Sequence, residues 1–155
     1  MIVFVCTGNI FRSLTAEYAL RRELGPGIAV SSAGTDDYPH VVRPNVRDYL
    51  LEKGLDVRAH KRRTVTREIL GGAQVVVAMS TDHQRLLREK FAIEVPVFLE
   101  ACGGKCAALP DIEEVVVDYR TNQAAVDAHV RKTIDTIIDL TPRLAQRIQD
   151  LRSRR

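Results

Sequence analysis

The feature that most constrains the fold is a series of four short runs rich in Val and Ile, separated by segments with helical spacing. Apolar residues follow one another in these runs without polar alternation, which is typical of strands buried on both faces of a parallel sheet. Strands that alternate with helices imply right-handed crossovers and a doubly wound α/β sheet. We therefore predict one domain over residues 1–155, a four-stranded parallel sheet with helices on both faces. The predicted strands are Ile2–Val5, Ile28–Ser32, Gln74–Ala78 and Val95–Leu99.

Helices are expected between and after these strands. Ser13–Leu24, Asn45–Lys53 and Thr81–Phe91 carry apolar residues at helical spacing, and Gly54 is expected to end the second of them. A longer amphipathic helix is expected near the C-terminus, where Pro142 should kink or split it. Its apolar stripe consists of Val126, Val130, Ile134, Ile137, Ile138, Leu144, Ile148 and Leu151.

The composition excludes several classes of function. A net charge of +3 is too small to indicate a nucleic-acid partner, and no aromatic residues interleave with a basic stripe. We expect no membrane insertion and no signal peptide, because no apolar segment has the required length or flanking charge. Three cysteines are an odd number, which favours individual thiols in a reducing compartment over a disulfide framework. We therefore expect a cytoplasmic protein.

The stretch Cys6–Ser13, CTGNIFRS, lies where the first predicted strand passes into a helix. Such a loop points backbone N–H groups into one concavity, which attracts an oxyanion. Gly8 lets the backbone turn closely, Asn9 tolerates left-handed dihedrals, and the fork of Arg12 matches two phosphate oxygens. Cys6 lies at the base of this positive field, which favours its thiolate, so the loop indicates phosphoryl transfer through a covalent intermediate. The predicted phosphate-binding residues are Thr7, Gly8, Asn9, Ile10, Phe11, Arg12 and Ser13. The alternative is that Cys6 is a small apolar residue at the end of a buried strand.

This loop resembles the phosphate loop of the low-molecular-weight protein tyrosine phosphatases, and the likeness continues along the whole chain. The first helix, the second strand and the segment after the second helix are similar in order and spacing, as is the third strand. The matching segments are TAE at 15–17, SSAGT at 31–35, GLDVRAHKRR at 54–63 and VVVAMSTDH at 75–83. The stretch LPDI at 109–112 lies where the family carries its general-acid loop.

The resemblance implies the catalytic roles. Cys6 would be the nucleophile, Arg12 the phosphate clamp, and Ser13 would assist the thiolate. Asp111 would be the general acid, with Asp118 as the second choice. An acid suits this chemistry because a phenolate leaves more easily when it is protonated in the transition state. From the residues alone, Asp111 is equally well read as a Pro-Asp turn.

The resemblance also implies supporting roles. Asn9, Ser32 and His60 would hold the loop in shape through hydrogen bonds, and Tyr38 would form an aromatic wall of the substrate slot beside Ile10. No metal or cofactor is expected, because the backbone N–H groups and the arginine stabilise the charge. The implied partner is a phosphotyrosine-containing protein, such as a bacterial tyrosine kinase.

The chain departs from the family pattern at several positions. Phe11 replaces a second cysteine that many members carry, and Leu14 and Ile112 stand where Pro is usual. Glu113 and Glu114 occupy positions that are aromatic in many members. Carboxylates beside a phosphate pocket repel an anionic substrate or select a basic peptide, and the sequence leaves both open.

Three other functions remain as alternatives. Protein arginine phosphatases share the loop but have Thr at the position of Ile10, where an apolar side chain suits an aromatic ring better. Thioredoxin-coupled arsenate reductases need a resolving cysteine pair after the third strand, where this chain has Met79; Cys102 and Cys106 come one strand later. These two thiols, which have no His nearby to suggest zinc, are either a redox pair or incidental. The third alternative is an inactive phosphate-binding module.

Overall fold

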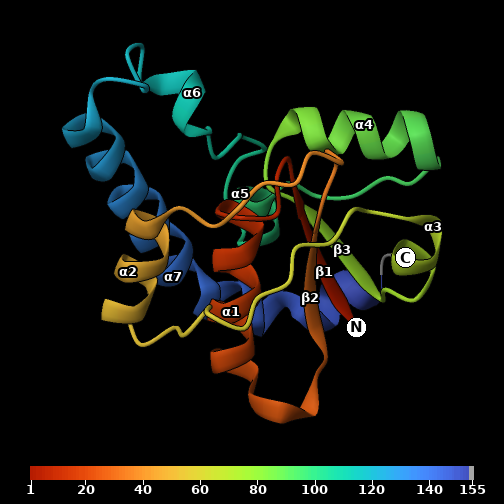
Figure 1. Ribbon diagram of the computed structural model, residues 1–155. Coiled ribbons are helices and arrows are strands. Elements are labelled where there is room, and N and C mark those ends of the chain that lie inside the picture. The colour runs from red at the N-terminus through yellow and green to blue at the C-terminus, as the bar shows by residue number, and fades with distance from the viewer. Residues whose placement is uncertain (154–155) are drawn as a thin grey trace.

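The computed structural model describes residues 1–153, so the last two residues of the predicted domain, 154–155, lie outside the described part. Its centre is a parallel sheet in which β1 (Ile2–Cys6) lies between β2 (Val30–Gly34) and β3 (Val75–Ala78) (Figure 1). Every residue of β1 and β3 is buried, as expected for runs without polar alternation. Three of the four predicted strands are therefore confirmed, each within two residues of its expected ends.

The helices of the described part follow the strands in alternation. They are α1 (Arg12–Leu24), α2 (Pro44–Glu52), α3 (Arg67–Gly71), α4 (Thr81–Phe91), α5 (Phe98–Ala101), α6 (Ile112–Val115) and α7 (Gln123–Ser153), with a 3₁₀ turn η1 (Gly25–Gly27). The three predicted internal helices are α1, α2 and α4. Gly54 follows α2 at a φ of 76°, the left-handed conformation that a helix-ending glycine supplies.

The prediction of a fourth strand at Val95–Leu99 is wrong, and so is the four-stranded sheet: the sheet of residues 1–153 has three strands. Pro96 has no N–H to donate to a neighbouring strand, although its carbonyl accepts a hydrogen bond from Ala78 N at 3.0 Å. Val97 forms one isolated parallel bridge with Ala78, and α5 begins at the next residue. The apolar run is buried at the edge of the sheet without extending it.

Helices cover both faces of the sheet, as predicted. Ile2 and Phe4 point to the face that α1 and α7 cover, whereas Val3 and Val5 point to the face that α3 and α4 cover. Figure 1 shows α1 and α2 on one side of the strands and α3 and α4 on the other. A further apolar cluster joins α1, α2 and α7, so α7 packs against two helices as well as the sheet.

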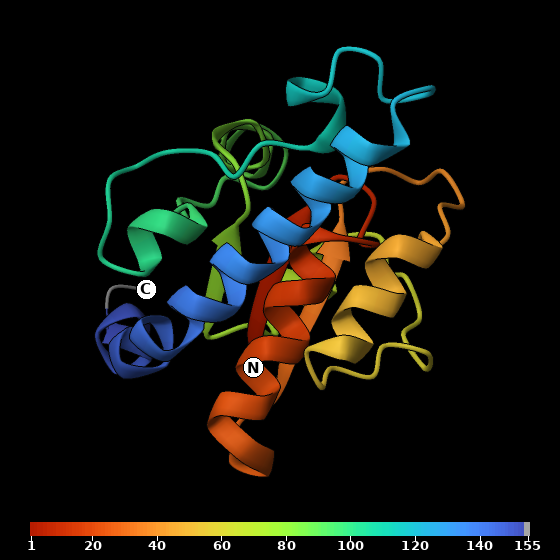
Figure 2. The same ribbon diagram turned by 90° about the vertical axis from the view of Figure 1, so that its left-hand side faces the viewer.

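The long helix α7 contains Pro142 without being split by it. Figure 2 shows the C-terminal part of α7 running in a different direction from its first part. Pro142 has no N–H for the carbonyl one turn earlier, which explains a bend at this point. None of the described helices combines the length and apolar character needed to cross a membrane.

The carboxyl ends of the parallel strands lie together on one side of the molecule, and the loops after β1 and β2 pack there against each other. Thr35 N donates to Cys6 O at 2.9 Å, and Asp36 N donates to Thr7 O at 3.1 Å. A Cβ atom on Gly34 would lie only 2.5 Å from Thr7 O, so the backbones are too close for any side chain there. The end of β2 therefore fixes the position of the loop that follows β1.

Candidate active site

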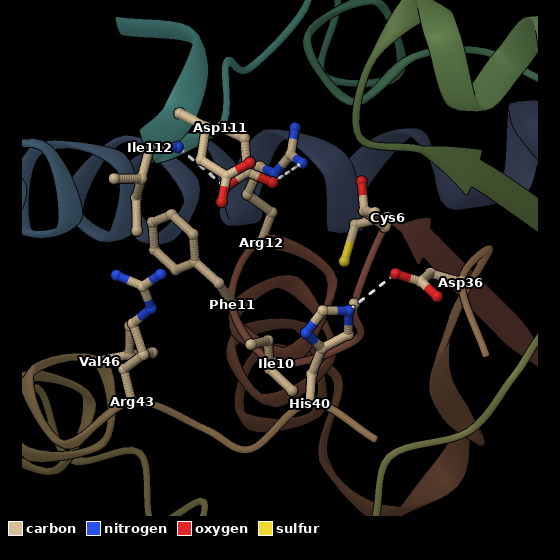
Figure 3. A pocket seen from close by; sticks show the side chains of 13 residues that line it. Cys6, Ile10, Phe11, Arg12, Asp36, His40, Arg43, Val46, Asp111 and Ile112 are labelled. Carbon is tan, nitrogen blue, oxygen red and sulfur yellow. Dashed lines mark hydrogen bonds and ion pairs between the residues drawn. The ribbon is translucent and has the colours of Figure 1, made fainter. Parts of the chain in front are cut away.

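A pocket of about 200 Å³ opens at the carboxyl ends of the strands. It is formed by the loop after β1, the segment from the end of β2 into α2, and the start of α6 (Figure 3). The lining residues are Cys6, Thr7, Gly8, Ile10, Phe11, Arg12, Asp36, His40, Arg43, Val46, Asp111, Ile112 and Glu113. Cys6, Arg12 and Asp111, the three residues with the principal predicted roles, therefore lie together although up to 105 positions separate them in the chain.

Cys6 is almost completely buried at the floor of the pocket. Its Sγ lies 2.9 Å from Ser13 Oγ, which in turn accepts a hydrogen bond from Asn9 Nδ2 at 3.1 Å. Because the amide already donates to this hydroxyl, the hydroxyl proton is free to point at sulfur. Ser13 is thus placed to donate to a thiolate at Cys6.

The loop is held in shape by Asn9, which has a φ of 56° and no exposed surface. Every polar group of its side chain is used: Nδ2 also donates to Ser32 Oγ at 2.6 Å, and Oδ1 accepts from Arg63 N at 2.9 Å. His60 Nε2 lies 2.9 Å from Asn9 O. The structure thus brings together Asn9, Ser32 and His60, the residues that we expected to support the loop.

Glu17 is a member of this network that sequence reasoning missed. Its carboxylate is fully buried on α1, accepts a hydrogen bond from Ser32 Oγ, and pairs with Arg21 Nη2 at 2.5 Å. His60 Nδ1 lies 4.0 Å from the same carboxylate, and burial lowers the pKa of His60 below its ordinary value. Glu17 belongs to the TAE segment that carries the family resemblance, but the sequence of this segment does not show that the glutamate points inward.

Arg12 contacts the acid loop directly. The side chain is buried; Nη1 donates to Leu109 O at 2.8 Å, and Nη2 forms an ion pair with Asp111 Oδ2. The other oxygen of Asp111 accepts from Ile112 N at 2.9 Å, so Asp111 also caps α6. Leu109 N donates in turn to Met79 O, which ties the acid loop to the end of β3.

His83, at the start of α4, is a second residue whose part in the site was not predicted. Its Nε2 lies 2.9 Å from Thr7 Oγ1, and its Nδ1 lies 2.7 Å from Ser80 Oγ. Burial and the nearby Arg12 charge lower the pKa of His83 to about 4, so the ring stays neutral near neutral pH. The phosphate loop is thus braced by α4 as well as by β2.

The pocket walls differ from the expected aromatic slot. Ile10 lies on the wall as expected, but Tyr38 is 66% exposed and lies outside the lining. Its ring packs instead on His40, with the ring centroids 4.9 Å apart, and His40 faces the pocket. Glu113 lines the opposite side, whereas Glu114 is exposed and lies outside the lining.

The remaining thiols lie apart from the pocket lining. Cys102 is buried in the core beneath α7, and burial raises the pKa of this thiol to about 12. Cys106 is exposed on the following loop, and both cysteines are free. Within residues 1–153 no three His, Cys, Asp or Glu side chains gather into a group able to hold a metal ion.

Known proteins resemble this chain in sequence and in fold. The low-molecular-weight protein-tyrosine-phosphatase Etp of Escherichia coli K12 is 35% identical over 83 residues, which cover 53% of this chain and 55% of Etp. The probable low-molecular-weight protein-tyrosine-phosphatase EpsP of Ralstonia solanacearum is 30% identical over 142 residues, 86% of this chain and 90% of EpsP. The structure of the arginine phosphatase YwlE from Geobacillus stearothermophilus superimposes with a TM-score of 0.79 at 26% identity, covering 96% of this chain and 92% of that one.

The family assignment rests on the whole length of the chain. The family model described as low molecular weight phosphotyrosine protein phosphatase matches residues 1–154. The match includes the loop after β1, the network around Asn9 and the loop that carries Asp111. The chain belongs to the family of low-molecular-weight phosphotyrosine protein phosphatases.

Proposed function

We propose that this protein hydrolyses phosphotyrosine in proteins through a phosphocysteine intermediate. The observation that carries the proposal is one pocket lined by a thiol, a buried arginine and a carboxyl group, those of Cys6, Arg12 and Asp111. The buried hydroxyl of Ser13 lies 2.9 Å from the thiol. These groups are the set needed for covalent phosphoryl transfer without a metal: a nucleophile, charge stabilisation and an acid. Membership of the phosphatase family supports the same reaction class.

In the first step the Cys6 thiolate attacks phosphorus, and the bond from phosphorus to the phenolic oxygen breaks. Asp111, protonated, gives its proton to that oxygen, so a neutral phenol leaves. Arg12 and the backbone N–H groups of the loop bind the phosphoryl oxygens as charge develops on them. The network around Asn9 holds the loop so that these donors converge.

In the second step a water molecule attacks phosphocysteine, and the sulfur–phosphorus bond breaks. Asp111, now ionised, takes a proton from the water, which regenerates both the acid and the thiolate. Ser13 Oγ, 2.9 Å from Cys6 Sγ, stabilises the departing thiolate. The products are phenol and inorganic phosphate.

The proposal is tested by phosphate release from a phosphotyrosine peptide, with the native protein compared with Cys6→Ser and Asp111→Asn. We expect Cys6→Ser to abolish turnover and Asp111→Asn to reduce it roughly a hundredfold or more, the usual contribution of a general acid. An Asp118→Asn variant is the matched control, because Asp118 is exposed and lies outside the pocket lining. Absence of turnover by the native protein would refute the proposal.

The pH profile gives an independent check. The substrate's phosphate becomes a dianion around a pKa of about 6, whereas the acid step needs Asp111 in its protonated form. We expect kcat/KM to pass through a maximum at mildly acidic pH. A rate that keeps rising above pH 8 would contradict the role of Asp111.

A protein arginine phosphatase is the second candidate, supported by the structural likeness to YwlE. The side chain of Ile10 on the pocket wall favours phosphotyrosine, because an apolar surface packs on an aromatic ring and cannot hydrogen-bond a guanidinium. Parallel assays with phosphotyrosine and phosphoarginine peptides of matched sequence decide between them. A higher kcat/KM for phosphoarginine would replace the first proposal by the second.

Arsenate reduction has less support. It requires a second thiol to attack the intermediate on Cys6, and neither Cys102 nor Cys106 lines the pocket. The raised pKa of Cys102 also makes it a poor nucleophile. The inactive-module alternative is opposed by the intact set of reactive side chains.

A further inference from the structure

A second acid–base pair lies in the pocket, on the wall opposite Asp111. His40 and Asp36 both line the pocket, and His40 Nε2 lies 2.8 Å from Asp36 Oδ2. Figure 3 shows this pair on the side of Cys6 away from Asp111, with the imidazole ring between Cys6 and Ile10. Neither residue has a part in the reaction proposed above.

The ring of His40 is fitted against the phosphate loop. A Cβ atom on Gly8 would lie 3.1 Å from His40 Cδ2, so the absence of a side chain at Gly8 is what lets the ring approach. The ring of Tyr38 also packs against the imidazole, with the two ring centroids 4.9 Å apart. The ring is therefore held at the mouth of the site, beside the N–H groups that would bind a phosphoryl group.

The hydrogen bond with Asp36 fixes which nitrogen carries the proton. Asp36 accepts from Tyr38 N at 2.7 Å, and this bond together with the bond from His40 lowers the pKa of Asp36 below its ordinary value. An ionised carboxylate only accepts, so Nε2 must donate to it. Nδ1 lies on the opposite edge of the ring, toward the side of the pocket formed by Ile10 and Phe11 (Figure 3).

The neutral and protonated rings then present opposite chemistry to a substrate. In the neutral ring Nδ1 carries a lone pair, which repels phosphoryl oxygens. In the imidazolium Nδ1 carries a proton and can donate a charge-assisted hydrogen bond to them. Histidine is the side chain whose charge commonly changes between pH 5 and 8.

We propose that His40, oriented by Asp36, is a specificity-determining residue that recognises the phosphoryl group of the substrate as an imidazolium. This inference rests on the proposed function for the identity of the substrate, but it concerns affinity for the phosphate group and can be measured without turnover. It also assigns a reason for the aspartate at position 36, whose carboxylate accepts from Nε2 and orients the ring so that Nδ1 faces the pocket. The preferred ligand is a phosphate group presented at mildly acidic pH.

Other charged groups face the same space as His40. On the pocket lining they are Cys6, Arg12, Arg43, Asp111 and Glu113. Arg62 approaches from outside, where it donates to the backbone carbonyls of Gly8 and Asp36. The pH dependence of phosphate affinity in the native protein alone would mix all these contributions. The informative quantity is therefore the ratio of the phosphate affinities of the native protein and a His40 variant at each pH.

The test is calorimetric titration of inorganic phosphate into the native protein and into His40→Asn, at pH 5.5 and at pH 8. At pH 5.5 we expect the variant to bind phosphate roughly tenfold more weakly, the effect of one lost charge-assisted hydrogen bond. At pH 8, where an ordinary imidazole is neutral, the ratio should fall toward one. The other charged groups are the same in both proteins, so the change at His40 is the difference that the comparison measures.

Two further variants separate recognition from folding. Asp36→Asn should weaken phosphate binding at pH 5.5, because the ring is then no longer held by a carboxylate. Asp37→Asn, the matched control, removes the same charge from an exposed neighbour that does not line the pocket and should leave binding unchanged. Circular dichroism and thermal unfolding of each variant show whether the fold is retained.

The outcomes distinguish this inference from the proposed function. A ratio that is the same at both pH values, or equal to one at pH 5.5, would refute the role of His40 while leaving the phosphatase proposal intact. No phosphate binding by the native protein at either pH would overturn both proposals. Turnover of a phosphotyrosine peptide with a pH-independent ratio would overturn only this inference.

Discussion

Ser32 connects β2 to Cys6 through side-chain hydrogen bonds alone. Its hydroxyl accepts from Asn9 Nδ2 at 2.6 Å and donates to the buried carboxylate of Glu17. Asn9 in turn contacts Ser13, which contacts Cys6. A single hydroxyl thus satisfies a buried amide and a buried carboxylate, and neither has access to water to replace it.

Ser32→Ala should therefore lower the free energy of unfolding by about 1–3 kcal/mol, the cost of leaving buried polar groups unpaired. The measurement is the midpoint of urea unfolding at unchanged m-value. Ser31→Ala is the matched control, because Ser31 is only partly buried and accepts its hydrogen bond from the half-exposed Arg63. A Ser32→Ala midpoint equal to that of the control would show that the network is not needed for stability.

Gly34 tests the close contact between β2 and the phosphate loop. In Gly34→Ala the new Cβ would lie 2.5 Å from Thr7 O, so the loop has to move. We expect a large loss of phosphate binding together with reduced thermal stability. Gly71→Ala places the same methyl group in open space at the end of α3 and should be neutral or stabilising by up to about 1 kcal/mol. Native-like phosphate affinity in Gly34→Ala would contradict the contact.

At the scale of elements, the N-terminal part of α7 anchors the loop that carries Asp111. His129 Nε2 lies 3.2 Å from Pro110 O, and its ring meets Phe11 edge-on at a centroid distance of 6.5 Å. Pro110 immediately precedes Asp111, so one histidine contacts both the phosphate loop and the acid loop. It thereby sets the position of Asp111 relative to Cys6.

His129→Ala should lower kcat severalfold with little change in KM, because the acid acts only in the transition state. The measurement is steady-state kinetics on two substrates, a phosphotyrosine peptide and an aryl phosphate whose phenol is acidic enough to leave without protonation. The loss should be confined to the first substrate. Lys132→Ala, an exposed change on the same helix, is the control. An equal loss on both substrates would mean that His129 affects the nucleophile and not the acid.

Some elements could be predicted from local sequence pattern and others could not. The bounds of β1, β3 and α4 were predicted closely, because Val-rich runs and a capped, periodic stretch indicate strands and a helix directly. The run at Val95–Leu99 has the same composition, but Pro96 removes the donor that a strand needs. The helices α3, α5 and α6 have only four or five residues, too few to display a period.

The parts of the candidate site that could be predicted from the sequence alone are those whose residues lie close together along the chain. Cys6, Arg12 and Ser13 lie within one loop, and Asp111 was found only through the family resemblance. Glu17 was missed because its neighbours on α1 do not show that the helix turns a carboxylate inward. The pocket wall is formed largely by loops, whose side-chain directions the sequence does not show; there His40, and not the expected Tyr38, lines the pocket.

For the whole molecule, His83 couples stability to pH. The folded-state pKa of about 4 lies below the ordinary value of 6.5, so the unfolded chain takes up a proton before the folded one does. The contribution of His83 to stability is therefore complete above pH 6.5 and is lost as the pH falls from 6.5 toward 4. The shift corresponds to about 3 kcal/mol.

His83→Gln removes this titration while keeping a polar side chain beside Thr7. The free energy of unfolding should fall more steeply for the native protein than for the variant between pH 7 and pH 4.5, since all other groups are shared. Urea unfolding of both proteins at several pH values measures the difference. Parallel curves would show that His83 has no depressed pKa in the folded state.

The ion pair between Arg12 and Asp111 has a consequence for product release. The same guanidinium that is to clamp phosphate is already occupied by a carboxylate of the protein itself. In the proposed reaction Asp111 is thus an intramolecular competitor of inorganic phosphate: once phosphocysteine is hydrolysed and Asp111 has released the proton taken from water, its carboxylate can displace the phosphate from Arg12. An enzyme built in this way gives up some affinity for its product and gains a faster return to the free state.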